Sequence, residues 1–293
     1  MQNLTVLPLG GCLLHQPLVA VGAKREVKVR ARLGIRGGTP LTHTLGELIQ
    51  LIGVLRHEVT LPPGVKRLAG LPAAFQPLPG IGDLRNVDVV LVEPNTPVEI
   101  VYDSFALQRN AIINSILVPI RSANPGPEVA KMTAHWLVRG MMREDDSARR
   151  LGVDLAKLVP DSMPLADIAR DVLVHARGDR RDVMTGLRHL RSILERPMAV
   201  LTYTPHYMPD GRPVSWPAGF REDMLSAAAE LRLPVMEPWK LVEKHGVAMA
   251  LIDYGHYTDE LNLIVGRKIL KFATRSCRAA ARHERGQMRE AAL

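Results

Sequence analysis

Near the start of the chain stands the stretch Leu4-Thr5-Val6-Leu7-Pro8-Leu9, followed directly by Gly10-Gly11-Cys12. A short apolar run that ends in two glycines is typical of a buried strand leading into a tight turn. We therefore predict that Cys12 lies at the tip of the first strand, where a side chain can act as a nucleophile.

Other apolar runs follow the same pattern, because they end in glycine, proline or asparagine and helical patterns separate them. They cover residues 26–33, 87–92, 198–203 and 233–236. The run at 87–92 is apolar apart from Asp88, as expected for a strand covered on both faces. Strands that alternate with helices predict an α/β fold, a three-layer α/β/α sandwich with a mostly parallel sheet of about five strands.

Two further segments complete this organisation. Thr44 is the expected N-cap of a helix, with Glu47 completing a capping box. Residues 102–196 are mostly helical in pattern and carry charge clusters at 143–146 and 177–182. We expect one α/β domain over residues 1–293, with 102–196 as a helical insertion or lid near the carboxyl edge of the sheet. A separately folded second domain is the alternative.

The composition is that of a globular protein, with 46% hydrophobic residues over 293 positions. No apolar run has the length of a transmembrane helix. Two cysteines make no disulfide framework. The stretch Leu9-Gly10-Gly11-Cys12 also resembles a bacterial lipobox, but no Lys or Arg precedes it and Pro8 interrupts the apolar run. We expect a cytoplasmic protein without a membrane partner.

The net charge of +8 is concentrated in the last stretch of the chain. Its basic residues have the spacing of one helix face: Lys268, Lys271, Arg275, Arg278, Arg282, Arg285 and Arg289. A solvated face and an anion- or partner-binding face both fit this pattern. An aromatic content of 4% and the lack of a recognisable motif argue against a nucleic-acid partner.

Candidate functional residues follow the predicted strands. They are Cys12, the Gly37-Gly38 loop, Asn95 and His206, with Asp253 and His256 just before the last helix. Because the carboxyl ends of parallel strands meet at one edge of a sheet, we expect these residues to border a common cleft.

Each candidate has a chemical role available. The N-terminus of a following helix would lower the pKa of the Cys12 thiol, His256 would accept its proton, and Asp253 would orient the imidazole. Backbone N–H groups of Cys12 and around Gly38, with the Asn95 amide, would hold an oxyanion, and His206 would lie at the rim. The structural alternatives are a buried Cys12 that only packs and a turn residue at Asn95. No Cys or His cluster predicts a metal site.

The pattern resembles the SGNH (GDSL-like) hydrolase superfamily. Gly10-Gly11-Cys12 stands where that superfamily has Gly-Asp-Ser, and Asp253-Tyr254-Gly255-His256 matches its terminal Asp-x-x-His. Gly38 or Gly37 stands in the glycine block and Asn95 in the asparagine block. Cysteine in place of serine is similar to the GSCFA-domain family and to a capsule-polysaccharide biosynthesis family whose first block ends Gly-Asn-Cys.

The resemblance implies an esterase or acyltransferase that acts on an acylated carbohydrate or a small metabolite through a Cys12 thioester. No resident cofactor is expected, and coenzyme A or another acyl donor would be a substrate. The alternative is a ligand-binding protein of the same fold without catalysis. The sequence does not indicate the oligomeric state.

Overall fold

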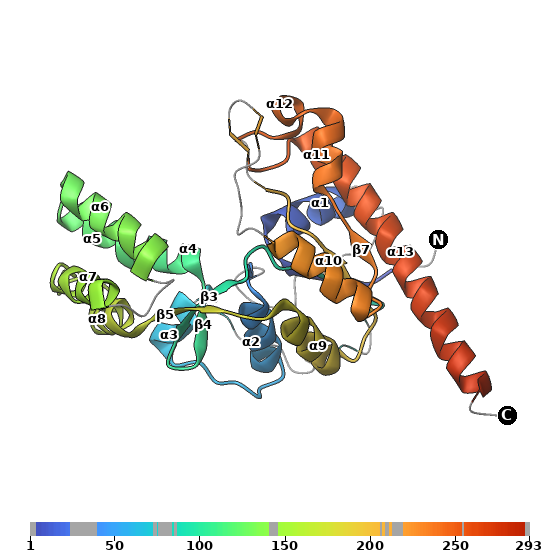
Figure 1. Ribbon diagram of the computed structural model, residues 1–293, viewed down its shortest axis with the longest axis horizontal. Coiled ribbons are helices and arrows are strands. Elements are labelled where there is room, and N and C mark those ends of the chain that lie inside the picture. The colour runs from blue at the N-terminus through green and yellow to red at the C-terminus, as the bar shows by residue number, and fades with distance from the viewer. Residues whose placement is uncertain are drawn as a thin grey trace.

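The computed structural model describes residues 4–23, 40–72, 75, 84, 87–140, 146–205, 207–208, 211–212, 219–253 and 255–290. They form two lobes, one built on a parallel sheet and one built on a small antiparallel sheet with helices (Figure 1).

The parallel sheet has the strand order β1-β2-β6-β7. Its strands are β1 (Val6–Gly10), β2 (Val89–Glu93), β6 (Met198–Leu201) and β7 (Val235–Met236). Each pair of neighbours is parallel, with Val6 opposite Val89, and Val200 opposite Val235. The predicted α/β fold with a mostly parallel sheet is confirmed. The strand expected at 26–33 lies outside the described residues.

Helices cover both faces of this sheet, which explains why its strands are continuously apolar. Alternate residues along a strand point to opposite faces, so Val90 and Val92 join one core cluster while Val89 and Leu91 join the other. The first cluster is completed by α2 (Leu45–Leu55), α9 (Val183–Leu194) and α10 (Phe220–Glu230). The second is completed by α1 (Cys12–Ala23), α11 (Trp239–His245), α12 (Val247–Ala250) and α13 (Asp259–Glu290).

The start of α2 agrees with the sequence pattern. Thr44 is its N-cap, and the Thr44 hydroxyl accepts a hydrogen bond from the Glu47 backbone N–H at 3.1 Å. The Glu47 carboxylate accepts the N–H of His43 at 2.9 Å, one residue earlier than in a standard capping box. These bonds satisfy N–H groups that the first turn of a helix leaves free.

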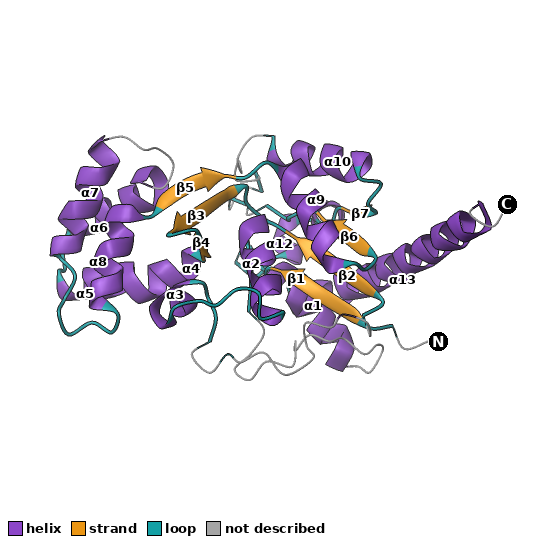
Figure 2. Ribbon diagram, turned by 90° about the horizontal axis from the view of Figure 1, so that it is seen from below, coloured by secondary structure: helices purple, strands orange, loops and turns teal. Residues whose placement is uncertain are grey.

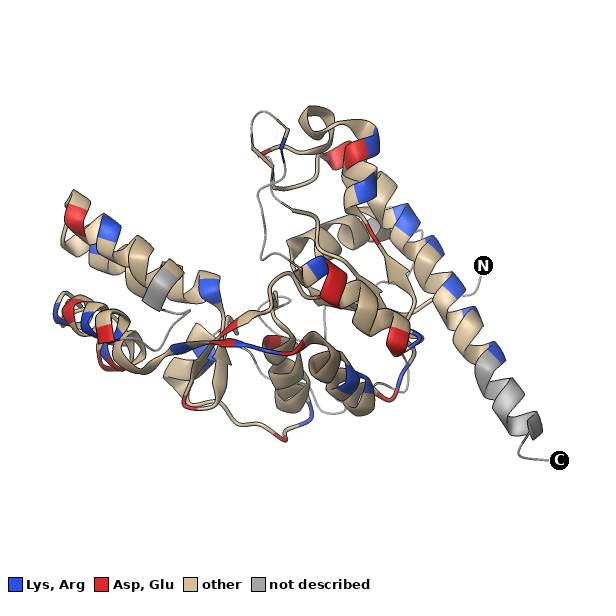
Figure 3. Ribbon diagram, viewed as in Figure 1, with Lys and Arg blue, Asp and Glu red and all other residues tan. Residues whose placement is uncertain are grey.

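Helix α13 crosses α1 at a close contact and then extends beyond the body of the protein (Figures 1 and 2). A Cβ atom on Gly266 would lie 2.3 Å from the Pro17 carbonyl oxygen, so only glycine allows this approach. Lys268, Lys271, Arg275, Arg278 and Arg282 are exposed along α13. In Figure 3, blue segments that mark Lys and Arg recur along the ribbon of this helix. These five residues have the spacing of one helix face, as predicted, whereas the side chains of Arg285 and Arg289 lie outside the described part of the structure.

The second lobe begins at an antiparallel sheet of order β4-β3-β5. Its strands are β3 (Val98–Tyr102), β4 (Phe105–Leu107) and β5 (Arg177–Arg180). The helices around it are α3 (Pro63–Leu68), α4 (Arg109–Ile112), η2 (Ile113–Leu117), α5 (Val118–Ala123), α6 (Pro127–His135), η3 (Trp136–Gly140), α7 (Asp146–Lys157) and α8 (Ala166–His175). A separate apolar cluster forms their core, where the Trp136 indole donates to the Leu173 carbonyl oxygen at 3.0 Å. Helix α9, although it lies within residues 102–196, packs on the parallel sheet instead.

A buried carboxylate joins the two lobes. Glu99 of β3 is 1% exposed and accepts hydrogen bonds from the Gly46 N–H at 2.6 Å and from Arg181 Nε at 2.7 Å. Gly46 lies in the first turn of α2, where the positive end of the helix dipole favours an anion. The contact therefore fixes the antiparallel sheet against the parallel-sheet lobe.

No helix in the described part of the chain combines the length and apolar character needed to cross a bilayer.

Candidate active site

Cys12 is the first residue of α1, directly beyond the end of β1, as the sequence predicts. The two glycines before it allow the turn to approach the end of β2. A Cβ atom on Gly10 would lie 2.7 Å from the Cβ of Glu93, and one on Gly11 would lie 3.2 Å from the Asn95 side-chain nitrogen. The turn that carries Cys12 therefore lies beside the Asn95 amide.

Asn95 lies in the loop after β2 and is 9% exposed. Its backbone N–H donates to the His43 carbonyl oxygen at 2.8 Å, and the N–H of neighbouring Thr42 donates to the Gly10 carbonyl oxygen at 3.1 Å. The segment Thr42–His43 is thus hydrogen-bonded both to the end of β1 and to the loop after β2. Cys12 follows β1 and Asn95 follows β2, so both lie at the carboxyl edge of the parallel sheet.

Asp253 and His256 form a hydrogen-bonded pair. His256 Nδ1 lies 2.7 Å from Asp253 Oδ2 and 3.0 Å from Oδ1, and the backbone N–H of Gly255 and of His256 donate to Oδ1. The hydrogen bond from His256 lowers the pKa of the Asp253 carboxyl. Donation from Nδ1 leaves Nε2 as the ring atom that can accept a proton.

The adjacent Tyr257 anchors this loop to the parallel sheet. Tyr257 pairs with Leu251 in an isolated bridge, and its hydroxyl shares a hydrogen bond of 2.7 Å with Thr204, which follows β6. The Asp253–His256 loop is therefore held at the carboxyl edge that also carries Cys12.

The Cys12 thiol is electrostatically linked to this pair. Burial raises the pKa of the thiol, and the nearby carboxyl groups of Glu93 and Asp253 raise it further. The N–H groups of Cys12 and Leu13 at the start of α1 act in the opposite direction but do not outweigh burial. The expectation of a lowered thiol pKa is therefore wrong. Within the described part of the chain, Cys12 and His256 are not hydrogen-bonded to each other.

Glu93 is a site residue that the sequence reasoning missed. It ends β2, is fully buried, and accepts the Gly11 N–H at 3.2 Å through Oε2, while Oε1 has no hydrogen-bond partner among the described residues. Burial raises the pKa of this carboxyl to about 8 despite the N–H groups of Gly11 and Leu14. An acidic residue at the end of an otherwise apolar run was the available signal.

Tyr203, just beyond β6, lies close to the same groups. Burial raises the pKa of its hydroxyl, and Glu93 and Cys12 raise it further. Two predicted site residues, Gly38 and His206, lie outside the described residues, so the second oxyanion N–H and the rim histidine stay predictions.

A cavity of about 630 Å³ borders His256. Its described wall comes from α1, Leu41, the loop around Ile252 and Tyr257, and the start of α13. Neither Cys12 nor Asn95 is among the residues of this wall, although both were expected to border a common cleft with His256.

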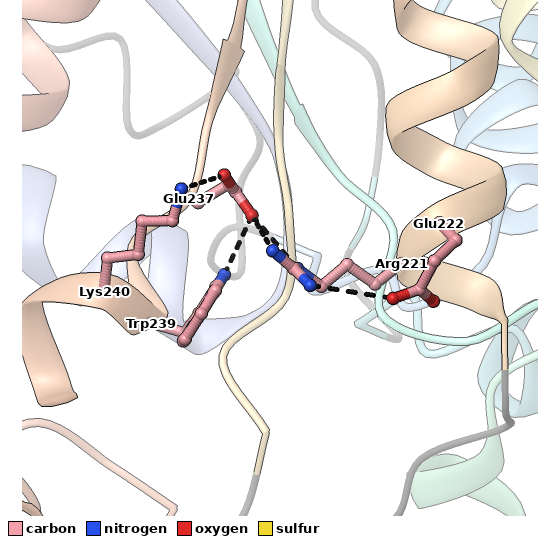
Figure 4. Close-up of polar contacts among 5 residues, drawn as sticks. All are labelled: Arg221, Glu222, Glu237, Trp239 and Lys240. Atoms are coloured by element: carbon pink, nitrogen blue, oxygen red, sulfur yellow. Dashed lines mark hydrogen bonds and ion pairs between the residues drawn. The ribbon is translucent and has the colours of Figure 1, made fainter.

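A charged cluster lies at the carboxyl end of β7 (Figure 4). The Glu237 carboxylate accepts hydrogen bonds from Arg221, Trp239 and Lys240, and the Arg221 guanidinium lies 4.6 Å from the centre of the Trp239 ring. Burial opposes ionisation of Glu237, but hydrogen bonds from Lys240, Arg221 and Trp239 outweigh it and lower the pKa to about 2. The cations of Arg221 and Lys240 neutralise the Glu237 carboxylate, and their hydrogen bonds to it connect the start of α10 to α11.

Among the described residues, no group of three or more His, Cys, Asp or Glu side chains is arranged to hold a metal ion.

Comparison with known protein families gives a match over most of the chain. The model of a family described as the TviD N-terminal domain, from a Vi capsule polysaccharide biosynthesis protein, matches residues 4–272. The matched range includes Cys12, Asn95, Asp253 and His256 and the first part of α13, as far as residue 272. No curated protein and no solved structure matches the chain.

Proposed function

The chain belongs to the TviD N-terminal domain family, and from this premise we propose an enzyme of capsule polysaccharide biosynthesis that transfers an acyl group to a carbohydrate hydroxyl. Cys12 is the nucleophile, His256 the general base and Asp253 the residue that orients the imidazole. These roles follow the resemblance to the SGNH hydrolase superfamily, and Asn95 donates a hydrogen bond to the oxyanion.

The first half-reaction starts from a neutral thiol, because burial raises the thiol pKa. His256 Nε2 accepts the thiol proton while the sulfur attacks the acyl carbonyl of the donor. The Asn95 amide and the Cys12 N–H stabilise the oxyanion. The bond to the leaving group breaks, the leaving group takes the proton from His256, and a thioester forms on Cys12.

The observation that carries the proposal is the joint placement of three groups. These groups come from three separate segments of the chain. Asp253 and His256 form a hydrogen-bonded pair, the Asp253 charge raises the pKa of the Cys12 thiol, and the Asn95 amide packs against Gly11. Convergence of this kind at the carboxyl edge of a parallel sheet is typical of active sites in α/β folds.

The test is incubation with p-nitrophenyl acetate, followed by intact mass measurement. The expected result is a burst of p-nitrophenol and one acetyl adduct on Cys12, lost in Cys12→Ala and kept in Cys277→Ala. Asn95→Ala should slow adduct formation by about 10²–10³-fold, as loss of one oxyanion donor does. Adducts that persist in Cys12→Ala would overturn the proposal.

Ligand binding without catalysis is the second candidate function. It is favoured by the raised thiol pKa and by the lack of a hydrogen bond between Cys12 and His256 within the described residues. A protein that binds carbohydrate but forms no adduct at any pH from 6 to about 9, where thiols become ionised, would establish this alternative.

A further inference from the structure

Helix α13 carries a line of exposed cations that no described carboxylate neutralises. We call it the basic strip, and it consists of Lys268, Lys271, Arg275, Arg278 and Arg282. None of the five forms an ion pair with a described residue. At 3.6 residues per turn and 1.5 Å per residue, the strip covers an arc of about 80° and a length of about 21 Å. It is therefore a narrow line of positive charge along one side of the helix.

The basic strip faces away from the body of the protein. The other side of α13 carries Val265, Ile269 and Ala273, which are fully buried in the core cluster on one face of the parallel sheet. Asp88 lies beside Cys277 of α13 and forms no ion pair with the strip. In Figures 1 and 3, α13 lies along one edge of the molecule and continues beyond it. A flat surface laid against this edge can therefore contact the strip along its length.

The stability of the helix does not explain the basic strip. Its members follow one another at spacings of three or four residues, and like charges at these spacings destabilise a helix. Residues 261–283 contain six Lys or Arg and no Asp or Glu, so this stretch has a net charge of +6, against +8 for the whole chain. A partner of opposite charge would offset the repulsion along the strip.

The side chains around the strip favour a bilayer surface over other polyanions. From residue 267 to residue 282, the exposed positions of α13 hold only Arg, Lys and Ala. They offer no aromatic ring for stacking on a base and no amide for reading a base edge. A helix in a groove of nucleic acid also has a phosphate strand on each side, whereas the strip covers one side only. A bilayer is a plane of mobile headgroups, and its anionic lipids attract cations without any shape recognition.

We propose that the basic strip binds the surface of a bilayer that contains anionic lipids, so that the protein rests on this surface without crossing it. Clusters of about four to eight Lys or Arg on one helix are typical of such binding. The proposal departs from the expectation that the protein has no membrane partner. That expectation followed from the lack of a long apolar run, and binding to a surface needs no such run. The roles of Cys12 and His256 do not enter the proposal.

The main experiment is sedimentation of the full chain with lipid vesicles, at about 0.1 M salt, where the Debye length is about 10 Å. One set of vesicles is phosphatidylcholine alone, and the other is phosphatidylcholine mixed with phosphatidylglycerol. The strip variant replaces all five cations of the basic strip with Gln, which is a good helix former. The matched control makes five Gln substitutions at exposed cations of the outer lobe that form no ion pair with a described residue, and so has the same net charge. These cations are Arg67, Arg121, Lys131, Arg149 and Arg150.

We expect the parent and the control to bind the mixed vesicles and not the neutral ones. The strip variant should bind at least about 100-fold more weakly, because each Lys or Arg near an anionic surface strengthens binding about fivefold. The double variant Arg275→Gln/Arg278→Gln should bind about 25-fold more weakly, and it tests the proposal even if the strip variant does not fold. Binding of the parent should fall steeply when the salt is raised to about 1 M, where the Debye length is about 3 Å.

Four results would each overturn the proposal. The parent could bind neither set of vesicles, or both sets equally. The control could lose as much binding as the strip variant, which would show an effect of net charge rather than of α13. The double variant could bind as the parent does. Finally, the parent could bind a DNA duplex, at equal concentration of negative charge, more tightly than the mixed vesicles, which would assign the strip to a nucleic acid.

Discussion

Glu93 shows how a single buried carboxyl can control both stability and reactivity at the candidate site. Its pKa in the folded protein is about 8, well above the ordinary value of a glutamic acid in an unfolded chain. Between these two values the folded state keeps a proton that the unfolded state has lost. The free energy of unfolding should therefore fall as the pH rises from about 4.5 to about 8, and the loss should level off above that range.

Glu93→Gln removes this titration and keeps the shape of the side chain. At pH 8 the variant should be more stable than the parent by about 1–3 kcal/mol, and at pH 4.5 the two should be close. Urea unfolding at pH 4.5, 6.5 and 8 measures both. Glu58→Gln, at an exposed position, is the control and should leave the pH dependence unchanged. A parent protein whose stability does not decline over this range would contradict the buried, protonated carboxyl.

The two cysteines should differ in their reaction with iodoacetamide. The pKa of Cys277 is raised to about 11, chiefly by burial, and its thiol donates a hydrogen bond to the Asp88 carbonyl oxygen at 3.4 Å. Cys12 lies at a helix start, where backbone N–H groups offset part of the effect of burial on its pKa. We expect Cys12 to be labelled first. Above about pH 8, where the Glu93 carboxyl becomes ionised, labelling of Cys12 should be faster still in Glu93→Gln, because a neighbouring negative charge is removed. Peptide mapping over time checks the order, and equal rates at the two thiols would contradict it.

At the scale of elements, the α1–α13 crossing depends on Gly266. A methyl group there would lie 2.3 Å from the Pro17 carbonyl oxygen, so the helices would have to move apart. Gly266→Ala should cost about 1–3 kcal/mol of stability, as overpacking does. Gly126→Ala is the matched control, because no atom lies within 4 Å of an added Cβ, and it should change stability by less than about 0.5 kcal/mol. Thermal unfolding of both variants makes the comparison.

The sequence predicts those elements whose own residues carry the signal. The strands β1, β2 and β6 are apolar runs because both of their faces are covered, and the start of α2 is marked by Thr44. Strand β5 has the sequence Arg-Gly-Asp-Arg and is mostly exposed, so it has the composition of a charged loop. It is a strand only because it pairs with β3, about 80 residues earlier, and no local pattern can show such a pairing.

The same distinction applies to the site. The Asp253–His256 pair forms within one short loop, so its spacing in the sequence was sufficient to predict it. The direction of the thiol pKa depends on burial and on carboxyl groups from distant segments, and these outweigh the local effect of the helix start. Glu93 was missed for the same reason, since its burial results from packing between β2 and the Cys12 turn.

At the scale of the whole molecule, the buried Glu99 carboxylate joins the two lobes through its hydrogen bond from the Gly46 N–H, and Arg181 beside β5 supplies its cation. Arg181→Ala would leave the Glu99 carboxylate, which is 1% exposed, without its cation. We expect a loss of about 2–3 kcal/mol, below the full cost of breaking a buried pair because Arg181 is partly exposed. Arg188→Ala removes an exposed ion pair with Glu230 and should cost at most about 1 kcal/mol. Urea unfolding compares the two, and equal losses would contradict the special role of Glu99.

The way in which the chain enters and leaves the outer lobe has a consequence for how the protein could be rebuilt. Val98 and Arg180 are register partners, and the Arg181 N–H donates to the Pro97 carbonyl oxygen at 3.2 Å. The two ends of the segment 98–180 are therefore already in contact. A tight turn in place of residues 98–180 would leave β2, α9 and β6 as an ordinary right-handed crossover unit. Residues 98–180 are therefore a segment inserted at one point of the parallel-sheet lobe. Helix α3 is the part of the outer lobe that comes from elsewhere in the chain, so a replacement would also have to cover Val65 and Leu68.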